Sequence, residues 1–372
     1  MTDNAGIRTK VMLCETPGGE RIYRDNTSIV AVLPPGRNVL STSWLNGGYH
    51  EHLRMVFNHQ ITGNSCRSDD LEGGSIDAYL RLTASRLGFD PNLSSGMLTG
   101  ADMKNAAVAT QTFCGLSVTA VVTGGIEGNG GRAGDPASFY EENGEFGGLG
   151  GTINTMLFIG ACLAPETMAR VVMTAAEAKA SVLQELMAPS CYSTGIATGS
   201  GTDMITIVCD RSHPLCLTNA GKHAKLGELI GRCVREATRD ALARQTDLCP
   251  ECQQNMLVRL KRFGIGEETF WEIASTLPGE YCRENFCAHL REMADDPMLV
   301  AATAAILHIA DEVAWKLLPE DAGRRAVHAM MAGIPAAIGM NVSVSPDGLC
   351  TGNESIPNEW VHFVVWCIEN GS

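Results

Sequence analysis

The sequence has little positive charge and no cluster of it. Its 372 residues include 28 Lys and Arg against 42 Asp and Glu, which gives a net charge of −14. Proteins that bind nucleic acids or anionic membrane surfaces gather basic residues in a patch or stripe. The lack of any basic block therefore disfavours both classes of partner, nucleic acid and membrane.

An export signal and long apolar runs are missing as well. The stretch from Thr2 to Lys10 contains polar and charged residues and no basic-then-apolar signal pattern, and no uninterrupted apolar run approaches the roughly 18 residues that a membrane span needs. We therefore expect a cytoplasmic protein. The 14 cysteines lie mostly in apolar contexts, as Cys209 and Cys367 do, which indicates reduced, buried thiols and not a disulfide framework.

Most standard catalytic signatures are absent. The glycines at 128 and 130 follow a predicted strand but lead into Gly134-Asp135-Pro136 and not into a helix, which is the wrong context for a dinucleotide site. The sequence contains no Gly-x-Ser-x-Gly elbow, no phosphate loop and no His-Glu-x-x-His motif. The common nucleotide, serine hydrolase and metalloprotease sites are thus excluded.

Two groups of metal-type ligands are incomplete. His50, His52 and His59 are close in sequence, but no carboxylate or cysteine completes the set at a recognisable spacing, so we interpret them as hydrogen-bonded histidines. Cys249 and Cys252 resemble half of a zinc site, but the second pair of cysteines is too distant and too widely spaced. No metal site is assigned, and the need for a metal stays open.

What is present is an ordinary globular composition, with 45% apolar and 19% charged residues. At this length two units are expected. Residues 1–245 predict an α+β unit, with a mixed, largely antiparallel sheet and packed helices, and residues 246–372 predict a smaller, mainly helical unit. Strands predicted at 11–14, 21–23, 28–33 and 38–43 suggest an antiparallel meander.

Further elements follow from apolar periodicity. We predict strands at 118–123, 153–159 and 204–209, and helices at 75–87, 165–187 and about 224–244. The second unit predicts helices at 255–263, 267–275, 283–293 and 298–318, and a strand or helix at 360–367. Between Gly124 and Gly151 there are 11 glycines in 28 residues, which favours a binding or lid element over a linker.

Polar residues and glycines gather at the ends of the predicted strands. Glycine lets backbone N–H groups approach a ligand, and Thr, Asn and Asp supply side-chain partners. Several such strand-end blocks in one unit predict a polar, partly backbone-lined pocket, although each block alone is more typical of a capped turn. The blocks cover residues 41–48, 96–102, 123–135, 151–154 and 197–203.

Six short motifs then follow one another along the first unit. They are Asn46-Gly47-Gly48, Thr99-Gly100-Ala101-Asp102, Gly151-Thr152-Ile153-Asn154, Ala175-Ala176-Glu177-Ala178-Lys179, Thr198-Gly199-Ser200-Gly201-Thr202-Asp203 and the run from His223 to Gly231. In combination, over about residues 30–245, they resemble the adenosylcobinamide amidohydrolases. The resemblance implies cleavage of the amide that joins the aminopropanol arm to the corrin ring of adenosylcobinamide, giving adenosylcobyric acid for corrinoid salvage.

The resemblance also implies a set of site residues. Catalytic candidates are His223, Glu228, Asp203, Glu177 and Thr202. Substrate-binding candidates are Asn46, Gly47, Gly48, His50, Asn58, Thr99, Asp102, Asn129, Asp135, Thr152, Asn154, Lys179 and Thr198. The partner implied is a corrinoid small molecule, cobalt enters only as part of that substrate, no separate cofactor is assigned, and a homo-oligomer is left open.

The chemistry leaves several roles open. Amide hydrolysis needs a nucleophile, oxyanion donors and an acid for the leaving amine. His223 and Glu228 are candidates for acid and base, but Glu228 equally suits the first turn of a helix. Asp203 could orient a base or cap a turn. The hydroxyls of Thr152 and Thr202 could be nucleophiles, and Gly151-Thr152 resembles the scissile position of self-cleaving amidohydrolases, yet direct attack by water is favoured.

Backbone N–H groups of Gly47-Gly48 or of the Gly199–Gly201 turn are the expected oxyanion donors. A corrinoid-binding module without catalysis is the competing function. The helical region is faintly similar to a cobamide-phosphate phosphatase domain, but His328-Ala329-Met330 and Asn358-Glu359 replace its acidic pairs, which implies that this activity is lost.

Overall fold

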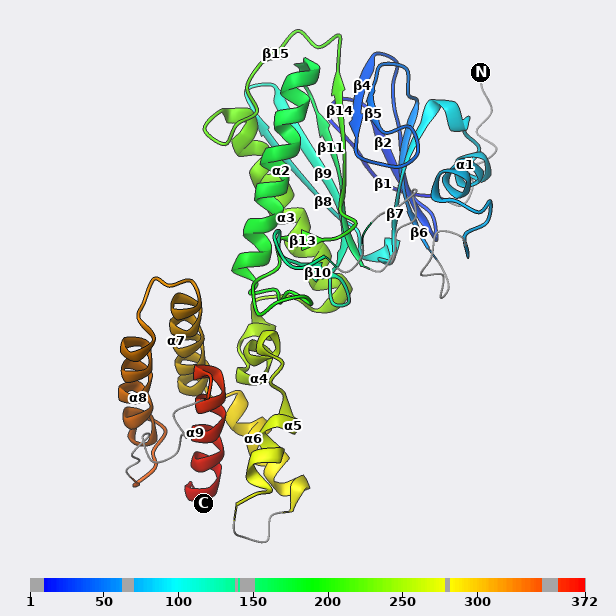
Figure 1. Cartoon of the computed structure of the whole chain (residues 1–372). Coiled ribbons are helices and arrows are strands. Elements are labelled where there is room, and N and C mark those ends of the chain that lie inside the picture. The colour runs from blue at the N-terminus through cyan, green and yellow to red at the C-terminus, as the bar shows by residue number, and fades with distance from the viewer. Residues whose placement is uncertain are drawn as a thin grey trace. The chain divides into compact units, whose positions relative to one another are not determined.

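The computed structural model describes residues 10–61, 70–137, 140, 151–277, 282–342 and 354–371. It divides into two compact units, Met1–Cys249 and Pro250–Ser372 (Figure 1). The first unit combines sheets and helices and the second is helical, so the predicted α+β class is confirmed. Part of the glycine-rich segment, at residues 138–139 and 141–150, lies outside the described residues, so the expected lid is not described as a whole.

The first sheet has five strands. Its order is β1 (Val11–Glu15), β2 (Arg21–Arg24), β3 (Ser28–Val32), β6 (Met55–Gln60) and β7 (Ser94–Thr99). All neighbours are antiparallel except β6 and β7, which run parallel. Because β6 and β7 are parallel, Asn58 and Leu98 come together near their common carboxyl end.

The second sheet has six strands and is also mixed. Its order is β5 (Gly48–His50), β4 (Arg37–Ser41), β14 (Met204–Asp210), β11 (Thr152–Ile159), β9 (Leu116–Gly125) and β8 (Ala107–Phe113). β11 and β14 are parallel, with Asn154 opposite Met204, and the other pairs are antiparallel. Two short ladders join β10 (Gly130–Gly131) to β13 (Gly199–Ser200) and β12 (Cys162–Leu163) to β15 (Cys216–Leu217).

Helices cover the outer faces of the two packed sheets (Figure 1). Met156 and Phe158 of β11 pack against the first sheet, whereas Leu157 and Ile159 of the same strand pack under α2 (Pro165–Glu185) and α3 (Lys225–Thr246). α1 (Ile76–Arg86) covers the first sheet through Leu80. The short helices η2 (Pro91–Leu93) and η3 (Met103–Asn105) precede β7 and β8. The alternation along one strand thus builds two apolar layers.

The predicted meander holds only for β1, β2 and β3. After β3 the chain reaches Pro34-Pro35-Gly36, and β4 then joins the second sheet, beside β14. Proline has no N–H for a sheet ladder, and Gly36 adopts a left-handed φ of +83°, so this segment turns the chain out of the first sheet. The strands β6, β7 and β8 and the helix α8 were not predicted. β6 carries Asn58, one of the predicted site residues.

The second unit is a helical bundle. It contains η4 (Glu251–Gln253), α4 (Met256–Leu260), η5 (Lys261–Phe263), α5 (Glu267–Ala274), α6 (Arg283–Ala294), α7 (Pro297–Ala314), α8 (Glu320–Ala337) and α9 (Ile356–Asn370). Residues 360–367 are therefore helical. By length and composition α7 could cross a membrane, with a mean hydropathy of 1.4, but core helices meet the same criterion, and 33% of it is buried here.

Charges are paired inside this second unit. Arg262 donates two hydrogen bonds to Asp311, of 2.8 and 2.6 Å, and both side chains are largely buried. The fully buried carboxylate of Glu359 pairs with Arg324 and lies 3.0 Å from His328 Nε2. These pairs satisfy the charges that the helices bury.

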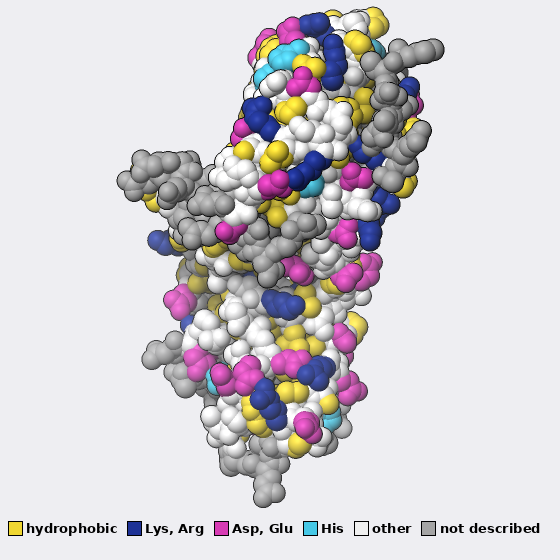
Figure 2. Space-filling view, turned by 90° about the vertical axis from the view of Figure 1, so that its right-hand side faces the viewer, with side chains coloured by type: hydrophobic (Ala, Val, Ile, Leu, Met, Phe, Trp, Pro, Cys, Tyr) yellow, Lys and Arg dark blue, Asp and Glu magenta, His cyan; other side chains and the backbone are white. Residues whose placement is uncertain are grey.

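The face in Figure 2 carries acidic and basic side chains interspersed among uncharged ones. Among the described cysteines as many are exposed as buried, so the prediction of mostly buried thiols is only partly right. The buried ones are Cys209, Cys233, Cys287 and Cys367, and the exposed ones are Cys114, Cys191, Cys216 and Cys282.

Candidate active site

Asp203 is the centre of a polar network where β14 begins. Its carboxylate pairs with Lys179 of α2 and accepts hydrogen bonds from Ile153 N (2.7 Å), Ser200 N (2.9 Å) and Ser200 Oγ (2.7 Å). The side chains of Lys179 and Asp203 are only 12% and 11% exposed. A carboxylate that accepts so many bonds is fixed in place, and it ties α2, β11 and the turn before β14 together.

Gly199 leaves the space that the buried ion pair occupies. A Cβ at this position would overlap the Asp203 carboxylate and lie 2.6 Å from Lys179 Nζ. Any side chain here must push the pair apart. The glycine of the predicted block is thus required by close approach of two charged groups, and its φ is not in the left-handed region.

We expect Gly199→Ala to destabilise the first unit by about 1–3 kcal/mol, the usual cost of overpacking. The measurement is hydrogen exchange of peptides from β11 and β14, which isolates the first unit. Gly231→Ala on α3 is the matched control: a Cβ there meets nothing within 4 Å, so it should not speed exchange. Unchanged exchange in Gly199→Ala would show that Lys179 moves aside without cost.

Thr152 and Asn154 stand at the start of β11, on the face toward the first sheet. Thr152 Oγ1 donates to Thr202 O at 2.8 Å or to Asn154 Oδ1 at 3.2 Å. Asn154 Nδ2 donates to Asn58 Oδ1 (2.8 Å) and to Leu98 O (2.9 Å). Thr152, Asn154 and Asn58 are each only 1% exposed. Four predicted residues therefore meet through hydrogen bonds that link the two sheets.

The carbonyl oxygen of Gly151 is held by two side chains. Asn129 Nδ2 and Thr202 Oγ1 each donate to it at 2.9 Å. Tyr192, which is exposed, donates its hydroxyl to Asn129 Oδ1 at 3.1 Å and so orients the amide. The site can thus bind a carbonyl oxygen with two donors, the arrangement that stabilises an oxyanion.

Three predicted catalytic residues lie elsewhere on the helices. His223 is exposed just before α3, and Glu228, in the first turn of α3, pairs with Lys225 and Arg232 on its own helix. The hydrogen bond from Lys225 lowers the pKa of Glu228. Glu177 of α2 pairs with Lys222 at the surface. None of the hydrogen bonds or ion pairs given for the described residues joins these three to Asp203, and their catalytic role stays a prediction.

Asn46 and Gly47 form a bend that leads into β5 and is tied to the residues at the start of β7. Asn46, with a φ of +47°, donates to Pro91 O and Ser94 O, both at 2.7 Å. A Cβ at Gly47 would overlap Ser43 O, so only glycine fits. His50 contacts Gly47 O at 3.0 Å. The contacts described for this turn are structural, and its role in binding stays a prediction.

The other predicted residues shape loops around the network. Asp102 caps η3 through Lys104 N (2.8 Å), and Thr99 Oγ1 accepts from Ala101 N (3.0 Å). Asp135 accepts from Ser190 Oγ at 2.6 Å, a bond that lowers its pKa, and Thr198 Oγ1 accepts from Ala133 N at 3.0 Å. These bonds organise turns next to the site, and direct contact with a ligand is untested.

Sequence reasoning missed three members of the network. Ser200 lies inside a quoted motif, but its two hydrogen bonds to Asp203 depend on the turn geometry. Thr123 Oγ1 accepts a hydrogen bond from Asn58 Nδ2 at 2.7 Å. In the sequence, the position of Thr123 at the end of a predicted strand was the only feature that pointed to a site. Tyr192 follows α2 in an irregular loop and has no recognisable motif. Its neighbour Cys191 donates its N–H to Gly130 O at 2.8 Å, which brings this loop beside Asn129.

The described residues contain no candidate metal site, and a surface hollow lies over α3. Among the described residues no group of three or more His, Cys, Asp or Glu could hold a metal ion. His59 forms hydrogen bonds with Ser28 Oγ (2.7 Å) and Tyr79 OH (3.1 Å), and burial lowers its pKa to about 4, so it is a neutral structural histidine near neutral pH.

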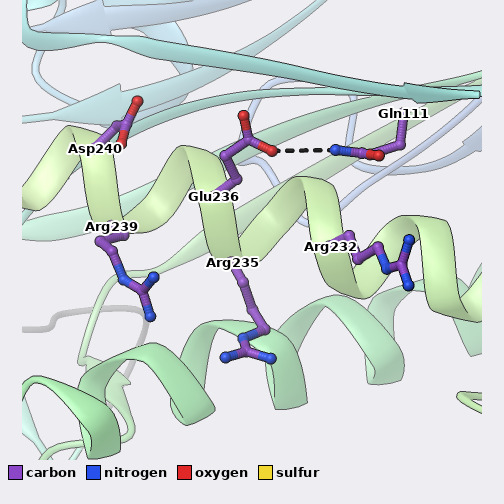
Figure 3. A pocket seen from close by; sticks show the side chains of 6 residues that line it. All are labelled: Gln111, Arg232, Arg235, Glu236, Arg239 and Asp240. Carbon is purple, nitrogen blue, oxygen red and sulfur yellow. Dashed lines mark hydrogen bonds between the residues drawn. The ribbon is translucent and has the colours of Figure 1, made fainter.

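An open hollow of about 350 Å³ lies over α3 and is lined by Gln111, Arg232, Arg235, Glu236, Arg239 and Asp240 (Figure 3).

Comparisons with known proteins extend these observations. The chain is 32% identical over 180 residues to an uncharacterized protein of Methanocaldococcus jannaschii, which covers 45% of this chain and 69% of that protein. Among solved structures, the PH0078 protein from Pyrococcus horikoshii OT3 gives a TM-score of 0.30 with 13% identity over 63% of this chain and 82% of its own. A beta-aminopeptidase of Burkholderia sp. gives 0.30 with 12% identity over 60% and 80%.

The strongest finding concerns the first unit. The sequence pattern of the adenosylcobinamide amidohydrolases (CbiZ) matches residues 13–250, which is more than half of the chain. The match includes the whole Asp203 network and ends where the second unit begins. This chain belongs to the adenosylcobinamide amidohydrolase family.

Proposed function

We propose that the first unit hydrolyses the amide bond between the corrin ring and the aminopropanol arm of adenosylcobinamide, giving adenosylcobyric acid. The family match supports this reaction. The observation that carries it is the carbonyl oxygen held by Asn129 and Thr202, in one network with the buried Lys179–Asp203 pair. In the cell the reaction belongs to corrinoid salvage in the cytoplasm.

The network supplies the parts that amide hydrolysis needs. Asn129 and Thr202, which hold Gly151 O in the intact chain, are two candidate donors for the oxyanion beside the glycine N–H groups expected from the sequence. The Lys179 ammonium is the buried cation of the site and the proton donor for the leaving amine, and Asp203 positions it. Water and the hydroxyl of Thr152 are the two nucleophiles available.

The second unit takes no part in this chemistry. The family match ends at residue 250. In the second unit the fully buried carboxylate of Glu359 pairs with Arg324 and lies 3.0 Å from His328 Nε2, so it is not free to hold a divalent cation. This pairing supports a non-catalytic second unit.

The test is incubation of the purified full chain with adenosylcobinamide, followed by mass spectrometry of the products. We expect adenosylcobyric acid and aminopropanol in equal amounts. Adenosylcobyric acid, which lacks the arm, is the control substrate and should stay unchanged. Tight binding of adenosylcobinamide with neither product would reject the hydrolase and identify a corrinoid-binding module without catalysis.

A further inference from the structure

We propose that the chain cuts its own peptide bond between Gly151 and Thr152, and that the new N-terminal Thr152 is the nucleophile of amide hydrolysis. The first half stands by itself on the geometry of this bond. The second half rests on the proposed function. It replaces the attacking water favoured from the sequence by a side chain of the protein.

The carbonyl of the bond to be cut is already bound as an oxyanion would be. Gly151 O accepts from Asn129 Nδ2 and from Thr202 Oγ1, both at 2.9 Å. These donors come from positions 22 and 51 residues away in the chain, so the fold brings them to one peptide oxygen. Side-chain donors on a carbonyl oxygen lower the barrier to attack on its carbon.

The nucleophile is the hydroxyl of the next residue. Thr152 Oγ1 and the Gly151 carbonyl carbon are joined through the Thr152 backbone, so attack closes a five-membered ring. Thr152 is only 1% exposed, and the acceptors of its hydroxyl are Thr202 O and Asn154 Oδ1. The acceptors draw the hydroxyl proton away from the oxygen that attacks.

The backbone at Gly151 permits only glycine. Its φ is +58°, in the left-handed region, and a Cβ would lie 3.1 Å from both Asn129 Cβ and Gly125 O. Thr152 next to it is the first residue of β11, opposite Gly125 of β9. The bond therefore lies at a bend where the chain enters a central strand.

The chemistry balances with water as the only reactant. Thr152 Oγ bonds to the Gly151 carbonyl carbon, the C–N bond breaks, and the hydroxyl proton ends on the Thr152 nitrogen, which leaves an ester. Water then adds to the ester carbon and the C–Oγ bond breaks. The products are a Gly151 carboxylate and a Thr152 with a free hydroxyl and a free α-amine.

The cut leaves Thr152 in place and empties the binding position for a carbonyl. β11 stays paired with β9 on one side and β14 on the other, and Asp203 still holds Ile153 N at 2.7 Å. Once the Gly151 carboxylate moves away, Asn129 and Thr202 can bind the carbonyl oxygen of the substrate amide. The α-amine of Thr152 is then the base next to its own hydroxyl.

The experiment is intact-mass analysis and N-terminal sequencing of the purified full chain during prolonged incubation. We expect two polypeptides, one ending at Gly151 and one beginning at Thr152, which stay together in gel filtration. Thr152→Ser should still be cut and Thr152→Ala should not. Thr202→Val should slow the cut by roughly 10²-fold, the usual effect of losing one oxyanion donor. Thr155→Ala, a buried threonine on the opposite face of β11, is the control and should be cut normally.

The outcomes separate this inference from the proposed function. A parent chain that keeps its full mass overturns the inference, and if it still hydrolyses adenosylcobinamide the proposed function stands. A folded Thr152→Ala chain, judged by circular dichroism, that keeps its hydrolysis rate overturns the role of Thr152. A cut chain that leaves adenosylcobinamide intact supports self-cleavage and rejects the proposed function.

Discussion

Replacing Asp203 by Asn should lower kcat/KM for adenosylcobinamide by roughly 10³-fold, in the range of a lost acid–base partner. The carboxylate accepts four hydrogen bonds, from Lys179, Ile153 and twice from Ser200. An asparagine offers one acceptor oxygen in place of two, and it leaves the Lys179 ammonium without its counter-ion in a site that is almost closed to solvent. The turn that carries Thr202 loses its anchor at the same time.

Comparing variants of the Asp203 network with variants of His223 and Glu228 tests which group of residues carries the chemistry. The rate of hydrolysis is measured for Asp203→Asn, Lys179→Met, His223→Ala and Glu228→Ala, with the thermal midpoint of each chain as the check on folding. Because His223 is exposed and Glu228 is paired with Lys225 and Arg232 on its own helix, we expect the rates of these two variants to stay within about twofold of the parent. If His223→Ala loses more of the hydrolysis rate than Asp203→Asn does, the acid or base of the reaction is His223, as the sequence suggested, and not the Asp203 network.

The second large effect concerns stability. Asp311→Ala should destabilise the second unit by about 3–5 kcal/mol, because it leaves the buried Arg262 guanidinium without its carboxylate. Urea unfolding followed by tryptophan fluorescence measures this, since four of the five tryptophans lie in the second unit: Trp271, Trp315, Trp360 and Trp366.

Two controls fix the interpretation of this loss. The double replacement Arg262→Met with Asp311→Leu removes both charges and should recover most of the stability. Asp321→Ala breaks a pair with Arg325 that is exposed, and it should shift the unfolding midpoint far less than Asp311→Ala does. Equal losses in Asp311→Ala and Asp321→Ala would mean that burial adds nothing to the Arg262–Asp311 pair.

Several elements could be predicted because their signals are local. β11, β14, α2 and α3 have long apolar patterns, and the turn before Asp203 combines glycines with hydroxyl residues at a strand start. Residues two apart on a helix, such as Glu177 and Lys179, do not face the same side. In the structure Lys179 points inward to Asp203, whereas Glu177 is at the surface with Lys222.

What could not be predicted depends on contacts between distant segments. Nothing local assigns β4 to a different sheet from β3, and the pairing of β4 with β14 joins residues far apart in sequence. The two donors on Gly151 O lie on separate loops. His223 and Glu228 are candidates through the family resemblance, and their catalytic role stays a prediction; the structure adds that Glu228 is paired along its own helix.

The strand order of the second sheet has a consequence for synthesis of the chain. β5, β4, β9 and β8 are made first, yet they occupy the two sides of the sheet, and the centre belongs to β14 and β11, which are made later. Until residues 152–210 leave the ribosome, the facing edges of β4 and β9 are unpaired. Open strand edges favour wrong pairing and slow, non-local folding. Overproduction of this protein should therefore be limited by aggregation of its half-made chain.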